Sequence, residues 1–268
     1  MRINTNLNAM IATNQMSKNT ALAGSSMEKL STGLRITKAG DDAAGLAVSE
    51  KMRAQIRGME QAERNVQDGI SMVQTAEGAL EEAGNIAQRM RELGVQAGND
   101  TLSDDDRNKV KEELTQLQDE MKKISEETKF NGKKLLNTAG TFTIQAGANS
   151  ETRKITTADL SSIANGLSTS SVSNSAQAQS FVAKVDTALE SINNARSELG
   201  AMQNRLEYTA NNLTTSTENL TAAESRIRDV DVAKEMVTLS KLNILNQASQ
   251  AMVSQAKQQP ESVSQLLR

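Results

Sequence analysis

The chain has 268 residues, 24% of them charged, a net charge of −3, and no His, Cys or Trp. The lack of His and Cys excludes imidazole bases, thiolate nucleophiles and the usual zinc or transition-metal sites. We therefore expect a protein that is not an enzyme and that needs no cofactor. Lys and Arg are interspersed with Asp and Glu, so we expect no nucleic-acid partner.

The sequence also gives no sign of a membrane protein. No apolar run approaches the length of a membrane span, and the first fifteen residues, MRINTNLNAMIATNQ, lack the apolar core of a cleaved secretory signal. Without Cys, stability cannot depend on disulfides, so the protein could function inside or outside a cell.

The N-terminal segment, residues 4–35, is compatible with a helix but carries only a weak apolar stripe. The stripe begins at Ile3, Leu7 and Met10, continues through small or polar residues, and moves to Leu30 and Leu34. A helix of this kind is marginal by itself. We expect an arm that folds on assembly, with an ordinary amphipathic arm as the alternative.

A junction is predicted at Gly40 to Gly45, because the two glycines disfavour a continuous helix. Asp41 or Asp42 can cap the helix that follows. From Leu46 to about Gly98, large and small residues recur on two lines seven residues apart, which predicts a long helix in close antiparallel packing. The lines are Met59, Val66, Val73, Leu80 and Ala87, and Ala62, Gly69, Ala76, Ala83 and Met90.

A third helix is predicted from Ser103, an N-cap residue followed by three acids in the favourable first turn. Asp104–Asp106 could be read as metal ligands, but a solvated helix start is the preferred interpretation. The period then changes to two at residues 141–145 and 152–156, which predicts a β-hairpin that lies on the helices. Residues 161–180 are expected to form a loop or a weak, exposed helix start.

The longest apolar repeat runs from Val185 to Val230. Its heptad positions are Val185, Ile192, Leu199, Leu206, Leu213, Leu220 and Ile227. Such a repeat predicts a helix that keeps one seam against partner helices. A last helix is expected from Val232 to about Gln258, ended by Pro260.

Together these patterns predict a mainly α fold: an elongated rod of long antiparallel heptad helices with one small β-hairpin at about 141–156. Residues 1–43 and 228–268 would form a terminal two-helix coiled coil from both chain ends, and residues 44–227 the helical rod domain. Parallel dimerisation through Val185–Ile227 is the rival arrangement. It is less favoured because the other two seams also need partners.

Several motifs resemble those of bacterial flagellins. In the N-terminal half they are Ser31–Ile36, Asp41–Gly45, Asn65–Ser71 and Glu77–Leu80, and in the C-terminal part Glu218–Asp231, Ile244–Ala248 and Pro260 with Gln265–Arg268. The likeness covers roughly residues 1–130 and 185–268. The chain departs from long flagellins in lacking a large central insert.

The resemblance implies a secreted structural subunit that is exported without a cleaved signal peptide and self-assembles into the helical flagellar filament used for swimming. The paired terminal arms would line the inner core and the middle helices the outer shell. The implied partners are other copies of the chain, an export chaperone on the C-terminal arm, the filament cap and hook-junction proteins. The expected assembly residues on the arms are Ile3, Leu7, Met10, Leu30, Leu34, Leu242, Leu245, Met252, Leu266 and Leu267.

Residues 88–96 resemble the stretch by which many flagellins are sensed by a vertebrate Toll-like innate receptor. By that likeness Arg89, Leu93 and Glu113 would face the receptor, although an Arg on a helix often makes only an exposed ion pair.

Two other functions remain open at this point. A hook–filament junction protein shares the terminal arms, and a secreted adhesive rod would use the Ser/Thr-rich segment 161–175 as its exposed surface.

Overall fold

The computed structural model describes residues 6–167, 172 and 174–266, without the side chains of 259–266. It divides into two compact units. Unit 1 contains both chain ends, Met1–Ala54 and Asn219–Arg268, and unit 2 is the middle of the chain, Gln55–Glu218. The described residues are mainly helical, as predicted.

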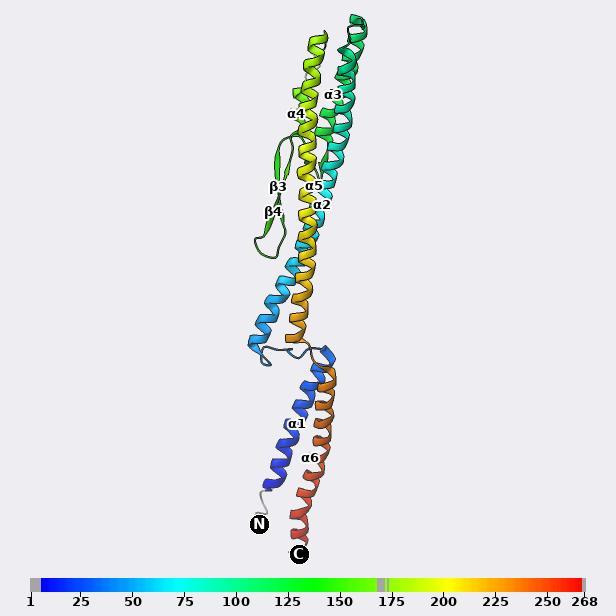
Figure 1. Ribbon diagram of the computed structural model, residues 1–268. Helices are drawn as coiled ribbons and strands as arrows, with labels where there is room; N and C mark the ends of the chain where they lie inside the picture. The colour runs from blue at the N-terminus through cyan, green and yellow to red at the C-terminus, as the bar shows by residue number, and fades with distance from the viewer. Residues whose placement is uncertain (1–5, 168–171, 173, 267–268) are drawn as a thin grey trace. The chain divides into compact units, whose positions relative to one another are not determined.

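Unit 1 is built around an antiparallel pair of helices, α1 (Leu7–Thr32) and α6 (Val232–Leu266). The two helices lie side by side (Figure 1). Asn6 contacts Ala256 at one end of the pair, and Leu34 bridges Asp229 at the other. The predicted pairing of the two chain ends is confirmed.

The C-terminal helix is longer than the sequence analysis predicted. Pro260 was expected to stop it, but α6 continues to Leu266. A proline inside a helix has no N–H to donate to the carbonyl four residues earlier. That carbonyl belongs to Ala256, and it accepts a hydrogen bond from the side chain of Asn6 instead.

Unit 2 has its core between two long helices, α2 (Ala43–Ala97) and α5 (Ser175–Arg228), each of which begins or ends in unit 1. Their cross-contacts pair low numbers with high ones, as in an antiparallel pair: Thr214 Oγ1 donates to Glu63 Oε1 at 3.4 Å, and Arg91 Nε contacts Asp186 Oδ1 at 2.6 Å. Most of the predicted heptad residues are buried here, namely Met59, Val66, Val73, Leu80 and Ala87 on α2 and Val185, Ile192, Leu199, Leu206 and Leu213 on α5. The last two predicted positions, Leu220 and Ile227, lie in unit 1 and are only half-buried.

A third helix, α3 (Asp104–Glu127), begins at the predicted N-cap, because Ser103 Oγ accepts from the backbone N–H of Asp106. Its buried residues include Leu114 and Met121, both on the predicted seam. A short helix, α4 (Leu160–Gly166), packs on α3 where the sequence suggested a loop or a weak helix start. The buried Gln118 fixes this contact by donating to the carbonyl of Ala164 at 2.9 Å.

The predicted hairpin is present as β3 (Gly140–Gln145) and β4 (Thr152–Thr157), paired antiparallel. It lies on α2 at Gly69, where an added Cβ would come within 2.2 Å of Ile144 Cδ1, so the absence of a side chain permits the close approach. A second, shorter hairpin, β1 (Lys129–Phe130) and β2 (Lys133–Lys134), was missed. Its turn residues Asn131 and Gly132 have φ of 47° and 77°, values that Asn-Gly turns favour.

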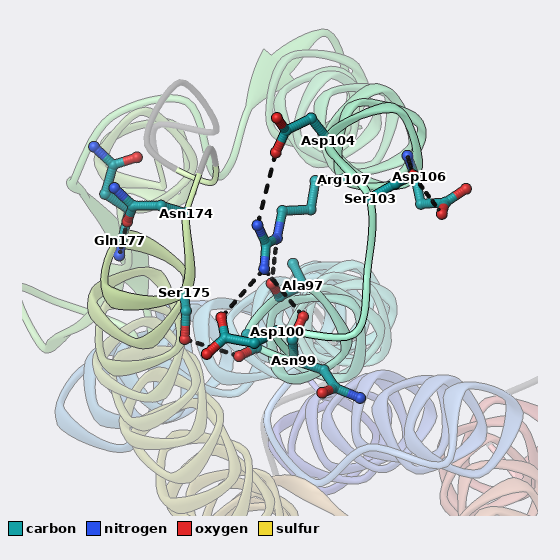
Figure 2. Close-up of polar contacts among 11 residues, drawn as sticks. Ala97, Asn99, Asp100, Ser103, Asp104, Asp106, Arg107, Asn174, Ser175 and Gln177 are labelled. Carbon is teal, nitrogen blue, oxygen red and sulfur yellow. Dashed lines mark hydrogen bonds and ion pairs between the residues drawn. The ribbon is translucent and has the colours of Figure 1, made fainter.

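The C-terminal end of α2 is closed by side chains from two other elements (Figure 2). Arg107 of α3 donates to the carbonyls of Ala97 and Asn99 at 3.3 and 3.1 Å, and Ser175 of α5 donates to the carbonyl of Gly98 at 2.9 Å. The last carbonyls of a helix have no partner within it and carry partial negative charge. Arg107 therefore provides both donors and a compensating charge, and it ties α3 to the end of α2.

Candidate functional site

The α1–α6 pair has an unusually thin core for two helices of 26 and 35 residues. The buried residues of α1 are Asn19 and Ser26, both polar, and among the α6 side chains that the structure describes, up to residue 258, the buried apolar ones are Leu239 and Leu242. Many large apolar side chains of the pair stay exposed, among them Leu7, Met10, Ile11, Leu22, Met27, Met236, Val237, Ile244 and Met252. A helix pair that exposes this much apolar surface presents an interaction surface.

Part of this surface is a groove of about 520 Å³ between the two helices. Its apolar lining comes from both chain ends: Ile11, Ala12, Leu245, Ala248, Met252 and Ala256. Ile11 and Met252 are 64% and 65% exposed. The groove can therefore take an apolar side chain or helix face from outside.

The junction between the helices is held by backbone hydrogen bonds between two segments that are distant in sequence. The N–H of Val230 donates to the carbonyl of Gly33 at 3.0 Å, and the N–H of Arg35 donates to the carbonyl of Arg228 at 2.6 Å. Gly33 ends α1 with φ of 71°, a left-handed conformation that glycine adopts without strain.

Charged side chains reinforce the junction. Arg228, whose side chain is only 11% exposed, contacts Glu50 Oε1 at 2.6 Å, and Arg53 contacts Glu224 Oε1 at 3.3 Å. The guanidinium of Arg35 donates to the carbonyl of Ile227. The two ion pairs link the start of α2 to the end of α5. They therefore hold together the two segments through which the chain leaves and re-enters unit 1.

The turn at residues 37–42 prepares the start of α2. Asp41 Oδ2 accepts from the backbone N–H of Lys38 and from the N–H and hydroxyl of Thr37, each at 3.0 Å. These bonds, that from Lys38 first, hold the pKa of the Asp41 carboxyl below its usual value. Asp42 Oδ1 accepts from the N–H of Gly45 at 2.8 Å, which is the predicted capping role.

The predicted assembly residues fall into three groups in the structure. Leu7, Met10, Leu245 and Met252 are exposed on the helix pair, as an assembly surface requires. Leu30 and Leu34 are half-buried and Leu242 is buried, so these three support the pair itself. Ile3, Leu267 and the side chain of Leu266 lie outside the described residues.

The predicted receptor-facing residues do not all share one surface. Arg89 Nη2 contacts Glu113 Oε1 at 3.0 Å, and both side chains are about half exposed. Leu93 is only 2% exposed, so placing it on an exposed face was wrong. It occupies an inward position of α2, three residues after the buried Met90.

Sequence reasoning missed two residues that make specific long-range bonds: Asn6, which bonds α6 at one end of the helix pair, and Arg228, which joins the end of α5 to α2. Asn6 carried a usable signal, since Asn often precedes a helix as its N-cap. Within the described ranges, no three acidic side chains come together as a metal site would need, and no helix is long and apolar enough to cross a membrane.

Long seamed helices, chain ends that pair with each other, and an uncovered apolar groove define a helical structural protein that assembles with further chains. The comparisons agree with this class. Residues 3–141 match the bacterial flagellin N-terminal helical region, and residues 182–267 match the bacterial flagellin C-terminal helical region.

Full-length relatives and a solved structure point to the same family. The flagellin of Halalkalibacterium halodurans is 54% identical over 272 aligned residues, and the flagellar filament 33 kDa core protein of Treponema phagedenis is 43% identical over 286, each alignment covering all of both chains. The crystal structure of Bacillus cereus flagellin is 35% identical and matches with a TM-score of 0.50, over 60% of this chain and 94% of that one. The chain belongs to the bacterial flagellin family and is a structural subunit of the flagellar filament.

The left-handed Gly33 gives a test of the junction. Gly33→Ala should destabilise unit 1 by about 1 kcal/mol, because Ala is strained at φ of 71° although there is room for its Cβ. Gly24→Ala is the matched control: it lies within α1, also has room, and should stabilise the helix by a similar amount. Urea unfolding of assembled protein followed by circular dichroism measures both. Equal effects of the two substitutions would contradict the role given to Gly33.

Proposed function

We propose that the α1–α6 pair is the surface through which filament subunits polymerise. Residues 1–43 and 228–268 would form the inner core of the filament, and residues 44–227 its outer shell. The observation that supports this most is the groove, which is lined by apolar residues of both chain ends and open to the outside. A neighbouring subunit that covers it would remove its apolar surface from water.

The energetics favour many modest contacts. Burying one exposed Leu, Ile or Met side chain stabilises by about 1.5–3 kcal/mol, and the pair carries more than five such residues. The ordering of both arms opposes this gain, at about 1–2 kcal/mol of backbone entropy for each residue that is fixed. Formation of the arms is therefore coupled to assembly, which disfavours premature association of single subunits.

The same surface is suited to the other partners that we propose. The segment that becomes α6 carries Met236, Val237, Ile244 and Met252, large apolar side chains that an export chaperone can cover before assembly. The filament cap and the hook-junction proteins would meet the same arms at the two ends of the filament. We propose that subunits assemble at the distal end of the filament, so that the assembled protein lies outside the cell.

A second proposal concerns recognition of released subunits by a Toll-like innate receptor. Arg89 and Glu113, on adjacent helices, form an exposed ion pair that holds both side chains in one orientation. Glu113 raises the pKa of Arg89, and Glu92 adds a further hydrogen bond. A fixed pair of opposite charges provides a specific polar contact for an incoming protein, and the buried Leu93 is no longer part of this proposal.

Substitution in the groove tests polymerisation. Ile11→Asp places a carboxylate where a neighbour would bury an apolar side chain, so growth onto filament seeds should fall at least tenfold. Ile11→Leu retains the apolar character and should grow nearly as the parent does. Light scattering and electron microscopy of seeded protein measure growth. Unchanged growth of the Ile11→Asp protein would contradict the proposed surface.

A cell-based receptor assay with monomeric protein tests the second proposal. Arg89→Ala should reduce the signal several-fold because the charged contact is lost. Arg91→Ala is the matched control, since Arg91 lies on the same helix and is also exposed and ion-paired, with Asp186. A full signal from the Arg89→Ala protein would end the proposal.

A further inference from the structure

At the end of the α1–α6 pair away from the junction, the side chain of Asn6 contacts both helices. Its Oδ1 accepts from the N–H of Ala9 at 3.1 Å and so caps the start of α1. Its Nδ2 donates to the carbonyl of Ala256 on α6 at 2.6 Å. The side-chain amide of Asn6 thus caps the N-terminus of α1 and also hydrogen-bonds to α6.

The acceptor of this bond is the carbonyl that Pro260 frees. Inside a helix, each carbonyl accepts from the N–H four residues later, and a proline has none to give. Because α6 continues through Pro260, its backbone leaves Ala256 without the usual donor. The regular helix pattern gives its other interior carbonyls a donor from its own backbone, so Asn6 meets the carbonyl that the proline leaves without one.

Beyond the Gly33–Val230 bridge at the junction, the packing of the pair gives its register little support. The buried residues of α1, Asn19 and Ser26, give packing little power to select one alignment over another. Between the two ends of the pair, the cross-helix side-chain bond is that of Thr20 Oγ1 to Asn246 Oδ1, which is exposed and 3.5 Å long. A slip of one helical turn moves α1 by about 5.4 Å along α6. It would break both the Asn6 bond and the Gly33–Val230 bridge, while it would hardly change the burial of small and polar residues.

We propose that Asn6 and Pro260 act together as a register latch: the proline exposes one carbonyl of α6, and the amide of Asn6 selects it. Asn6 is then a positioning residue that aligns the two chain ends and so shapes the groove for the next subunit. The inference rests on the proposed role of the α1–α6 pair in polymerisation. It resembles the way in which a single polar residue fixes the register of a coiled coil.

The test separates the latch from simple helix capping by combining two substitutions. Asn6→Ser keeps a side-chain oxygen for the N-cap, where Ser is about as good as Asn, but removes the amide donor. Pro260→Ala restores a backbone N–H for the Ala256 carbonyl, so that the carbonyl no longer needs Asn6. The single variants and the double variant in the full chain form a double-mutant cycle.

Register can be read directly because the chain has no cysteine of its own. A Thr20→Cys/Asn246→Cys pair reports the observed alignment, and a Thr20→Cys/Gln250→Cys pair reports a slip of one turn. In each background, intrachain disulfide yields are measured on seeded filaments, where the helix pair is formed. Growth onto seeds is measured in parallel.

In the chain that keeps Pro260, we expect Asn6→Ser to raise two quantities about five- to tenfold: the ratio of slipped to aligned disulfide, and the protein concentration needed for growth. In the Pro260→Ala background, Asn6→Ser should change neither the disulfide ratio nor that concentration. An equal effect in both backgrounds, or no effect in the parent, would overturn the latch. Failure of the parent chain to grow on seeds would contradict the proposed function, whereas normal growth with an unchanged disulfide ratio in Asn6→Ser filaments would contradict the latch alone.

Discussion

The structure depends on the contact between α1 and α6, which join the two ends of the chain across more than two hundred residues of sequence. Two helices normally hold together by burying apolar seams, and here one seam is largely small or polar while large apolar residues remain outside. The pair is therefore poorly stabilised by its own core and well supplied with surface for a neighbour. Folding of the chain ends and assembly of the filament become one process, because the same apolar contacts serve both.

Unit 2 shows the opposite distribution. The predicted lines of α2 and α5 are buried against each other, with α3, α4 and the hairpins adding further cover. The small residues on α2, such as Ala62 and Ala83, permit close packing, and large ones, such as Leu80 and Leu206, fill the space. This unit has a complete core of its own. Two contacts lie where α2 and α5 meet the assembly arms. They are the backbone hydrogen bond between Gly33 and Val230 and the ion pair between Arg228 and Glu50.

The fold followed from the sequence wherever a long apolar repeat decided the structure. The heptads of α2 and α5, the Ser103 cap and the hairpin near 141–156 all rest on local periodicity or capping chemistry, which a single sequence contains. The β1–β2 hairpin had its Asn131-Gly132 signal but only two residues in each strand, so periodicity was silent.

Other features depend on tertiary partners that no local pattern reveals. Pro260 was expected to end α6, and helix propensity alone supports that view. The helix continues through Pro260, and the carbonyl of Ala256, which the proline leaves without its usual donor, accepts from the distant Asn6 instead. Leu93 was placed outside by family likeness, although its helical position faces the core. For the assembly site, the sequence identified the arms and several exposed residues, whereas the groove could be seen only once both helices were placed in space.

Amide hydrogen exchange on monomer and on filaments tests the central claim most directly. The account predicts rapid exchange of residues 7–32 and 232–258 in monomer, strong protection of both in filaments, and protection of unit 2 in both states. Full protection of the two chain ends in isolated monomer would contradict it.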